Sequence, residues 1–280
     1  MRDDFVAFIL THGRPDQLHT LNSLKRMNYS GRVVIVVDTE DSQLNRYLEL
    51  YGDDVYVFDK ATVAKTMDEG DNFYDRRTIV YARNACFEIA KELGYKYFIQ
   101  LDDDYSSWQY RIDETGNWGK KAPVIKDIDG IFTAMVEYVE KTPILTVAMG
   151  QGGDFIGGAD NKPLCKRKCM NSFVCSTDKP FKFMGRVNED VNTYTVFGST
   201  GKLMLTHMGA SLVQKATQSN SGGMTDVYQA SGTYVKSFYT IIYHPSGTRI
   251  GLMGSKNMRL HHQINWKHTA VCVLREEIKK

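Results

Sequence analysis

The sequence lacks a long apolar run, an excess of charge of either sign and any internal repeat. Its 280 residues carry 35 lysines and arginines against 33 aspartates and glutamates, a formal net charge of +2. This balance excludes a uniformly cationic nucleic-acid coat, although it permits a local basic patch. Apolar runs such as residues 33–37 fall far short of the roughly 20 residues that a membrane-spanning helix needs. We therefore expect a protein with no membrane partner.

The sequence has few cysteines, and their number is odd, which argues against a disulfide framework. The five cysteines are Cys86, Cys165, Cys169, Cys175 and Cys272. The first residues are partly acidic, where a secretory signal needs positive charge, so we expect free thiols in a cytoplasmic protein. Residues 165–175 hold three cysteines but no C-x2-C pair, so a structural role is favoured over zinc.

What is present is enough apolar material, 42% of the residues, for a sizeable core. In the first half, short apolar runs alternate with helical spacing. The predicted strands are residues 5–10, 32–37, 55–58 and 97–101, and the predicted helices are 16–27, 42–51 and 81–93. Strands that are apolar on both faces and separated by helices predict an α/β fold with a parallel sheet covered on both sides.

The second half has a different pattern. A helix is predicted over residues 128–138, followed by a Gly-rich loop and by strand-like runs at 201–207, 237–244, 249–253 and 269–274. We expect this mixed α+β half to complete the sheet and to form the second wall of a cleft. The length predicts two units, 1–125 and 126–280, fused into one domain.

Carboxylates follow two of the predicted strands. Asp38 ends the second strand, and three consecutive aspartates, Asp102, Asp103 and Asp104, end the fourth. Ligands of parallel α/β sheets bind at the carboxyl ends of the strands. Three adjacent carboxylates repel one another unless a cation or hydrogen-bond donors offset the charge. Oxygen ligands favour Mg²⁺ or Mn²⁺, whereas the alternative is a solvated acidic turn.

The segment Phe98-Ile-Gln-Leu-Asp-Asp-Asp104, preceded by the strand–turn–strand pattern that ends at Asp38, resembles the nucleotide-sugar-binding half of GT-A glycosyltransferases. The resemblance covers about residues 5–105 and implies a Rossmann-type mixed sheet flanked by helices. It also implies a UDP-sugar donor and an Asp-x-Asp motif that holds a divalent ion against the donor diphosphate. Asp104 is then the first choice for metal contact, Asp102 contacts the ribose or the metal, and Asp103 supports them.

Other donor-side roles follow from the same resemblance. Residues 11–15 look like the first donor loop of those enzymes, and Asp38 matches the acid near the uridine. The arginines before and in the third predicted helix suit phosphate oxygens, although Arg83 could equally be a surface charge. A C-terminal histidine often adds a metal ligand, and the adjacent His261 and His262 are the natural pair. The implied donor contacts are Thr11, His12, Arg14, Asp38, Arg76, Arg83, Asp102 and Asp103.

A second landmark is Phe183-Met-Gly-Arg-Val-Asn-Glu-Asp-Val-Asn192. It resembles the acceptor-side acidic motif of GT-A enzymes and, more narrowly, that of the TET-associated glycosyltransferases, which phages encode to decorate hydroxymethylated pyrimidines in DNA. Residues 170–171, 222–224 and 259–266 look like the same group. Asp190 or Glu189 is the candidate base for the acceptor hydroxyl, with Arg186 beside them. The alternative is a salt bridge from these acids to Arg186.

The resulting hypothesis is a metal-dependent transfer of sugar from a UDP-sugar to 5-hydroxymethylcytosine or a related base in double-stranded phage DNA, in the host cytoplasm. Lys162 and residues 166–168 form a basic stretch before Phe173, Phe181 and Phe183, which suits DNA as well as a solvated loop. The rival functions are transfer to a glycan, lipid or protein, a nucleotidyltransferase, and a non-catalytic DNA-binding module. The sequence contains no G-x-x-x-x-G-K-[ST] phosphate loop.

Overall fold

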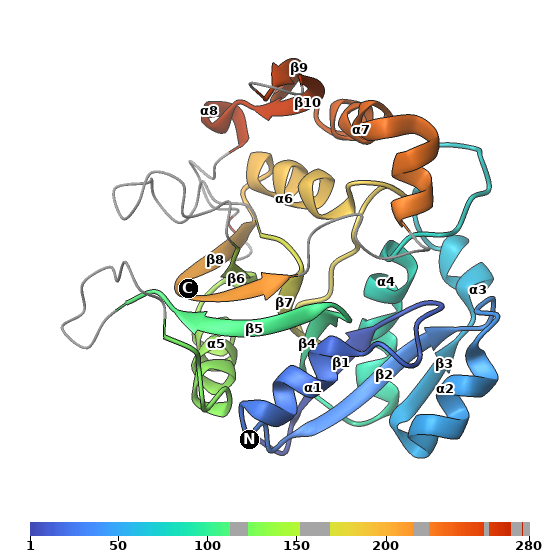
Figure 1. Cartoon of the computed structure of the whole chain (residues 1–280). Coiled ribbons are helices and arrows are strands. Elements are labelled where there is room, and N and C mark those ends of the chain that lie inside the picture. The colour runs from blue at the N-terminus through green and yellow to red at the C-terminus, as the bar shows by residue number, and fades with distance from the viewer. Residues whose placement is uncertain (113–122, 152–168, 215–223, 255–257, 270–275, 277–280) are drawn as a thin grey trace.

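The computed structural model describes residues 1–112, 123–151, 169–214, 224–254, 258–269 and 276 (Figure 1). Its N-terminal half contains the parallel strands that the sequence predicts. They are β1 (Phe5–Leu10), β2 (Arg32–Asp38), β3 (Val55–Phe58) and β4 (Tyr97–Asp102), in the spatial order β3-β2-β1-β4. β1 is buried along its whole length, as a parallel strand covered on both faces must be.

The helices of this half also lie where the apolar spacing predicts them. They are α1 (His19–Arg26), α2 (Leu44–Tyr51) and α4 (Val80–Glu92), with the short η1 (Gly52–Asp54) and α3 (Lys60–Ala64) as additions. α3 begins directly after β3 because Asp59 accepts hydrogen bonds from the backbone N–H groups of Ala61 and Thr62, which caps the helix.

The second half completes the sheet, as expected, with strands of mixed direction. β7 (Ser172–Ser176) is antiparallel to β4 and to β6 (Ile144–Gly150), β6 is parallel to β8 (Leu203–Gln214), and β8 is antiparallel to β5 (Tyr105–Tyr110). The eight strands form one sheet in the order β3-β2-β1-β4-β7-β6-β8-β5. The fold is therefore α/β with a mixed sheet, and the sheet continues across the predicted boundary at residue 125.

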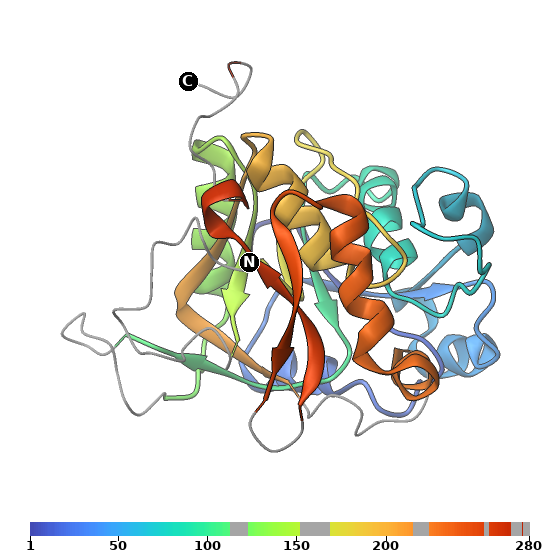
Figure 2. The same cartoon turned by 90° about the horizontal axis from the view of Figure 1, so that it is seen from above.

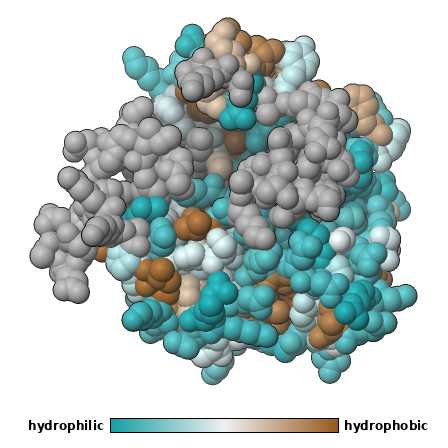
Figure 3. Space-filling model, in the orientation of Figure 1, coloured by the Kyte–Doolittle hydropathy of each residue, from teal (hydrophilic) through white to brown (hydrophobic). Residues whose placement is uncertain are grey.

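The two faces of the sheet are covered by different helices. Val6, Phe8 and Leu10 of β1 pack with α4 and α6 (Glu189–Ser199), whereas the alternate residues of β1 pack with α1 and α5 (Asp129–Lys141). The period-two alternation of a strand produces this division. On the face shown in Figure 3, hydrophilic residues dominate the lower half, over α1 and α2.

The C-terminal segment stands above α6, as Figures 1 and 2 show. It comprises α7 (Met224–Tyr243), the antiparallel hairpin β9 (Thr248–Met253) and β10 (Arg259–Ile264), and α8 (Trp266–Thr269). The strand predicted at 237–244 is wrong, because these residues end α7. Its β-branched residues favour a strand locally, but helical spacing places Tyr239, Thr240 and Tyr243 on the side that faces residues 68–71 and 186–192.

The remaining predictions for this half have mixed outcomes. β9 and the helix α5 lie where predicted, and β8 is longer than the predicted 201–207. In the run 269–274, Thr269 ends α8, and the other residues lie outside the described residues. Among the helices of the described residues, none is both long enough and apolar enough to cross a membrane.

Candidate active site

The carboxyl ends of the parallel strands bring the predicted donor residues to one edge of the sheet. β1 ends before Thr11, β2 ends at Asp38, and β4 ends at Asp102. Because β1 lies between β2 and β4 with all three parallel, these residues meet at the same edge. Residues 102–104, called the acidic turn below, lead from β4 into β5.

Asp103 joins the acidic turn to the loop that follows β1. The Thr11 hydroxyl donates to Asp103 Oδ2 at 2.7 Å, and Arg14 Nη2 lies 3.2 Å from Asp103 Oδ1. Burial raises the pKa of Asp103 to about 6, although the Arg14 charge and the Thr11 hydrogen bond oppose the rise. Both carboxylate oxygens are engaged, so Asp103 supports the turn from within the protein.

Arg83 connects the acidic turn to the acceptor-side motif. Its Nη2 lies 2.9 Å from Asp102 Oδ1, and its Nε lies 3.1 Å from Glu189 Oε1, a residue 106 positions further along the chain. The side chain is only 1% exposed, and its guanidinium lies over the ring of Phe173 at 5.0 Å. Arg83 is therefore a buried cation between two carboxylates, not a charge on the helix surface.

Burial governs the carboxylates on either side of Arg83. It raises the pKa of Asp102 to about 6, with Arg83 opposing the rise and Asp104 adding to it. Burial and then the neighbouring Asp190 also raise the pKa of Glu189. The guanidinium of Arg83 therefore does not fully offset the effect of burial on these two acids, because desolvation of a carboxylate favours its protonated form.

Asp104 is the least satisfied member of the turn. Gln214 Nε2, at the end of β8, donates to Asp104 Oδ2 at 3.2 Å, whereas the buried Asp104 Oδ1 has no hydrogen-bond partner among the described residues. Burial raises the pKa of Asp104, and Asp103 adds to the shift. In the described part of the chain, no three His, Cys, Asp or Glu side chains are grouped to hold a metal.

The donor set nevertheless fits a divalent ion that takes most of its ligands from a bound substrate. Mg²⁺ and Mn²⁺ bind through one or two carboxylates together with substrate phosphates and water. Asp104 Oδ1 is a buried oxygen without a partner in the described part of the chain, and Asp102 lies in the same turn. These residues would hold the ion, and a cation there would offset the mutual repulsion of the turn.

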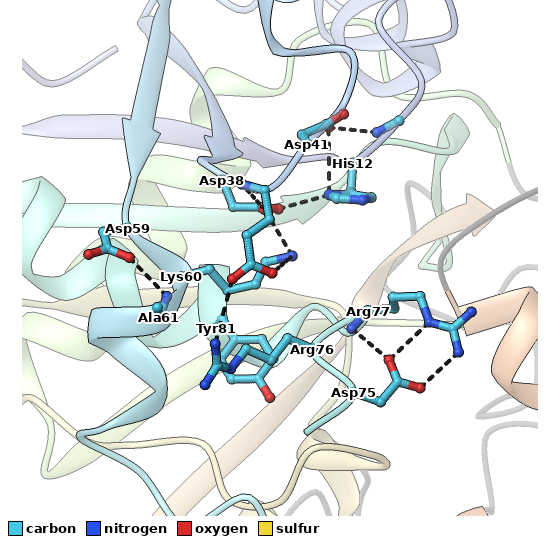
Figure 4. A network of polar contacts seen from close by, with 12 residues as sticks. His12, Asp38, Asp41, Asp59, Lys60, Ala61, Asp75, Arg76, Arg77 and Tyr81 are labelled. Atoms are coloured by element: carbon cyan, nitrogen blue, oxygen red, sulfur yellow. Dashed lines mark hydrogen bonds and ion pairs between the residues drawn. The ribbon is translucent and has the colours of Figure 1, made fainter. Parts of the chain in front are cut away.

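The second carboxylate centre surrounds Asp38 (Figure 4). His12 Nδ1 lies 2.8 Å from Asp38 Oδ2, and Lys60 Nζ lies 2.9 Å from Asp38 Oδ1. Asp41 accepts a hydrogen bond from the backbone N–H of Gly13 at 2.7 Å, which ties the loop after β1 to this centre. Burial alone would raise the pKa of Asp38, but the hydrogen bonds from His12 and Lys60 outweigh it and lower the pKa.

Lys60 and Glu40 are residues of this centre that sequence reasoning missed. Lys60 is the first residue of α3, directly after β3, so the rule that ligands gather at strand ends could have indicated it. Arg76, predicted to contact the donor, lies 3.6 Å from Glu40 at the same centre. The structure thus brings Arg76 to the edge of the sheet, but beside Asp38 and not beside the acidic turn.

Arg186 does not pair with the acids of its own motif. Its Nε lies 2.9 Å from Asp71 Oδ2, and its Nη2 donates to the Tyr239 hydroxyl at 3.0 Å. The salt bridge considered as the alternative for Glu189 is therefore wrong, because Arg83 is its partner. Asp190 lies beside Glu189 in the first turn of α6, where the helix dipole favours negative charge.

His261 and His262 lie in β10, on the far side of α6 from the sheet edge. His262 Nδ1 lies 3.5 Å from Asn188 Nδ2, and His261 Nδ1 lies 2.7 Å from the His262 carbonyl oxygen. Asn188 immediately precedes Glu189, so His262 contacts the segment that carries the candidate base. A metal-ligand role for either histidine stays a prediction.

The predicted DNA-binding stretch is only partly described. Lys162 and residues 166–168 lie outside the described residues, as do Cys165 and Cys272. The aromatic side chains that follow are core residues: Phe173, Phe181 and Phe183 are buried and their rings contact one another. The prediction that they stack on bases is wrong, because the sheet and α6 enclose them. Cys86, Cys169 and Cys175 are buried free thiols.

Comparison with solved structures finds similar chains among enzymes. Glucosyl-3-phosphoglycerate synthase from Mycobacterium tuberculosis, in complex with Mn²⁺, UDP-glucose and glycerol 3-phosphate, is similar with a TM-score of 0.45 and 9% identity, over 94% of this chain and 90% of that chain. The same enzyme with Mn²⁺, UDP and phosphoglyceric acid gives 0.43 and 10%, over 93% and 86%. Mannose-1-phosphate geranyltransferase from Thermus thermophilus gives 0.30 and 16%, over 53% and 41%.

The sequence comparisons are more specific. No curated protein matches the chain. The family model described as TET-Associated Glycosyltransferase matches residues 5–223, which include the acidic turn, Arg83 and the motif around Glu189. Because this match spans most of the sequence, the chain belongs to the TET-associated glycosyltransferase family.

Proposed function

We propose that the protein transfers a sugar from a UDP-sugar to the hydroxymethyl group of 5-hydroxymethylcytosine, or of a related modified base in phage DNA, with the help of Mn²⁺ or Mg²⁺. The main support is the pair of contacts that Arg83 makes with acids of the two halves of the site. Arg83 joins Asp102 of the acidic turn to Glu189 of the acceptor-side motif, so donor-side and acceptor-side acids lie within one chain of contacts. Family membership adds the glycosyltransferase chemistry.

The donor half of the site holds the nucleotide-sugar. Asp102 and Asp104 would hold the divalent ion, which, when bound, offsets the charge that develops on the leaving diphosphate. Arg83 stands beside them as a buried guanidinium, and its Nη1 has no hydrogen-bond partner among the described residues. That atom can donate to a phosphate oxygen. The Asp38 centre would receive the nucleoside.

The acceptor half activates the hydroxyl. The hydroxyl oxygen attacks the anomeric carbon, the bond from that carbon to the phosphate oxygen breaks, and the nucleoside diphosphate leaves. In an inverting reaction the hydroxyl proton passes to a carboxylate, and Glu189 and Asp190 are the candidates. Burial raises the pKa of Glu189, which makes it a stronger base once ionised, but its Oε1 is also engaged by Arg83.

The test is a mass shift on a nucleoside. Duplexes with and without 5-hydroxymethylcytosine are incubated with UDP-sugars and Mn²⁺, then digested to nucleosides for mass spectrometry. A hexose or pentose mass gain only on the modified base is expected. Transfer to a glycan, lipid or protein acceptor with no gain on any base would replace the DNA acceptor. Release of pyrophosphate from a nucleoside triphosphate would instead favour a nucleotidyltransferase.

A further inference from the structure

The segment between α3 and α4 presents two aromatic rings to water. Phe73 is 72% exposed and Tyr74 is 78% exposed, which makes them the most exposed large apolar side chains among the described residues. Residues 71–77, called the aromatic loop below, contain no other large apolar side chain. Two adjacent, largely exposed rings are therefore the main apolar feature of this loop.

The aromatic loop is firmly anchored at its base. Arg186, which is 4% exposed, forms an ion pair with Asp71 at 2.9 Å, and its guanidinium lies 5.8 Å from the Phe73 ring centroid. The residues just before the loop are tied to the same segment, because the backbone N–H of Gly185 donates to the Asp68 carbonyl and that of Arg186 to the Glu69 carbonyl. The rings therefore project from a fixed support.

The backbone within the loop is fixed as well. The backbone N–H of Phe73 donates to Asp71 Oδ1 at 2.9 Å. The guanidinium of Arg77 forms a bidentate salt bridge with the Asp75 carboxylate. Tyr74 has a φ of 57°, a left-handed conformation that an aromatic residue rarely adopts. This conformation carries an energetic cost.

The loop borders both halves of the candidate active site. On the donor side, Arg76 lies 3.6 Å from Glu40, and Figure 4 shows Arg76 and the Asp75–Arg77 pair beside the Asp38 centre. On the acceptor side, Asp71 holds Arg186, which stands three residues before Glu189. The loop that carries the two rings is thus connected by ion pairs to both halves of the site.

We propose that Phe73 and Tyr74 form a stacking platform for a nucleobase of the acceptor, either the target base or its neighbour. This inference rests on the proposed function and deepens it, because it names the part of the acceptor that the loop binds. Every base has a flat π-face, and stacking on rigid aromatic side chains binds nucleic acid without a sequence requirement. A protein partner would need a broader apolar surface than two rings among charged residues.

Charge around the rings is consistent with a nucleic-acid strand. The two acids of the loop are neutralised locally, Asp71 by Arg186 and Asp75 by Arg77. Arg77 is a half-exposed cation in the same loop, paired with Asp75. In this proposal the basic residues orient the nucleic-acid strand, and the two rings provide the stacking contact.

The experiment compares wild type with Phe73→Ala, Tyr74→Ala and the double variant. Binding of a labelled single-stranded and a duplex oligonucleotide containing 5-hydroxymethylcytosine is measured by fluorescence anisotropy, and KM and kcat for the same oligonucleotides are measured at saturating UDP-sugar. We expect a loss of affinity of about tenfold per ring, with the matching rise in KM. Hydrolysis of UDP-sugar without acceptor should stay at the wild-type rate.

Further variants separate stacking from other effects. Phe73→Leu keeps an apolar side chain without a ring and should weaken binding like Phe73→Ala, whereas Phe73→Trp should retain it. Tyr138→Ala, an exposed ring on α5, serves as the matched control and should bind like wild type.

The outcomes distinguish the platform from the proposed function. If wild type modifies the base and the double variant binds and reacts equally well, the platform is overturned while the function stands. If wild type neither binds nor modifies any oligonucleotide, both are overturned. Full binding by Phe73→Leu would replace stacking with a simple apolar contact and also overturn the platform.

Discussion

Two carboxylate centres lie at the same edge of one sheet, and they are compensated to different extents. Asp38 is 4% exposed and has two close partners, the His12 ring and the Lys60 ammonium, within 3 Å, and their hydrogen bonds lower its pKa despite burial. The acidic turn is also buried, but it has three carboxylates and two guanidinium groups, and its pKa values are raised. Burial is common to both, and the centres differ in whether hydrogen bonds and neighbouring charges outweigh its effect on the pKa.

The two centres also differ in whether every carboxylate oxygen has a partner among the described residues. Both oxygens of Asp38 are engaged, one by the His12 ring and one by the Lys60 ammonium, so its charge is already stabilised before any substrate binds. At the acidic turn, Asp104 Oδ1 has no partner among the described residues. We infer that the protein holds the first centre for hydrogen bonding and leaves the second one ready for a cation.

The largest expected effect comes from removing a charge at the acidic turn. Asp104→Asn should lower the transfer rate by about 100-fold or more, because the variant loses the oxygen expected to bind the ion. In metal-free buffer its Tm should equal or exceed that of wild type, since one of three repelling charges is gone. Adding Mn²⁺ should raise the Tm of wild type by several degrees and leave that of the variant unchanged.

Asp103→Asn is the matched control for this prediction. Asp103 is held by Thr11 and Arg14, so its replacement should lower Tm with and without metal. Full activity of Asp104→Asn, or an equal response to Mn²⁺ in both proteins, would contradict the division of roles within the turn.

A smaller effect is expected when the ion pair between Lys60 and Asp38 is removed. Lys60→Met leaves the buried Asp38 with the His12 ring as its remaining close side-chain partner, and the free energy of unfolding should fall by about 3 kcal/mol. Chemical denaturation in urea measures the change. Combining the variant with Asp38→Asn should restore part of the loss, because no uncompensated carboxylate then remains. A double variant less stable than Lys60→Met would be incompatible with this explanation.

The smallest effect is a pH dependence of the same centre. The pKa of Asp38 is lower in the folded protein than its ordinary value of 3.8, so ionisation stabilises the fold. Its contribution is fully present above about pH 4 and is lost as pH falls through the folded pKa. The difference in unfolding free energy between wild type and Asp38→Asn should therefore shrink on acidification from pH 6 to about pH 3. A difference that grew instead would show that the pKa is raised.

The first half of the fold could be predicted because its strands are buried on both faces and therefore read as continuous apolar runs. The second half contains signals that local reading does not detect. β5, with the sequence Tyr-Ser-Ser-Trp-Gln-Tyr, is an edge strand with polar residues, and α6 buries Asn192, Thr193 and Thr195 among its core contacts. In α7, a β-branched run suggested a strand, but contacts with the active-site segment hold it as a helix.

The candidate site shows the same limit. The rule on strand ends located Asp38 and Asp102 without any structure. The rule does not predict the contact between Arg83 and Glu189, which are 106 positions apart in the sequence. It also does not predict that Arg186 forms its ion pair with Asp71. Sequence proximity suggested the wrong partner for Glu189, because α6 points its first turn toward α4 rather than toward its own preceding arginine.

The position of β5 has a consequence for how the protein is made. The chain leaves β4 through the acidic turn and continues into a strand at the far end of the sheet, whose partner is β8. Gln214, which holds Asp104, follows it by 110 residues. A growing chain on the ribosome therefore cannot form the contact between Gln214 and Asp104 until residue 214 has emerged. A product truncated before Gln214 lacks the side chain that donates to Asp104.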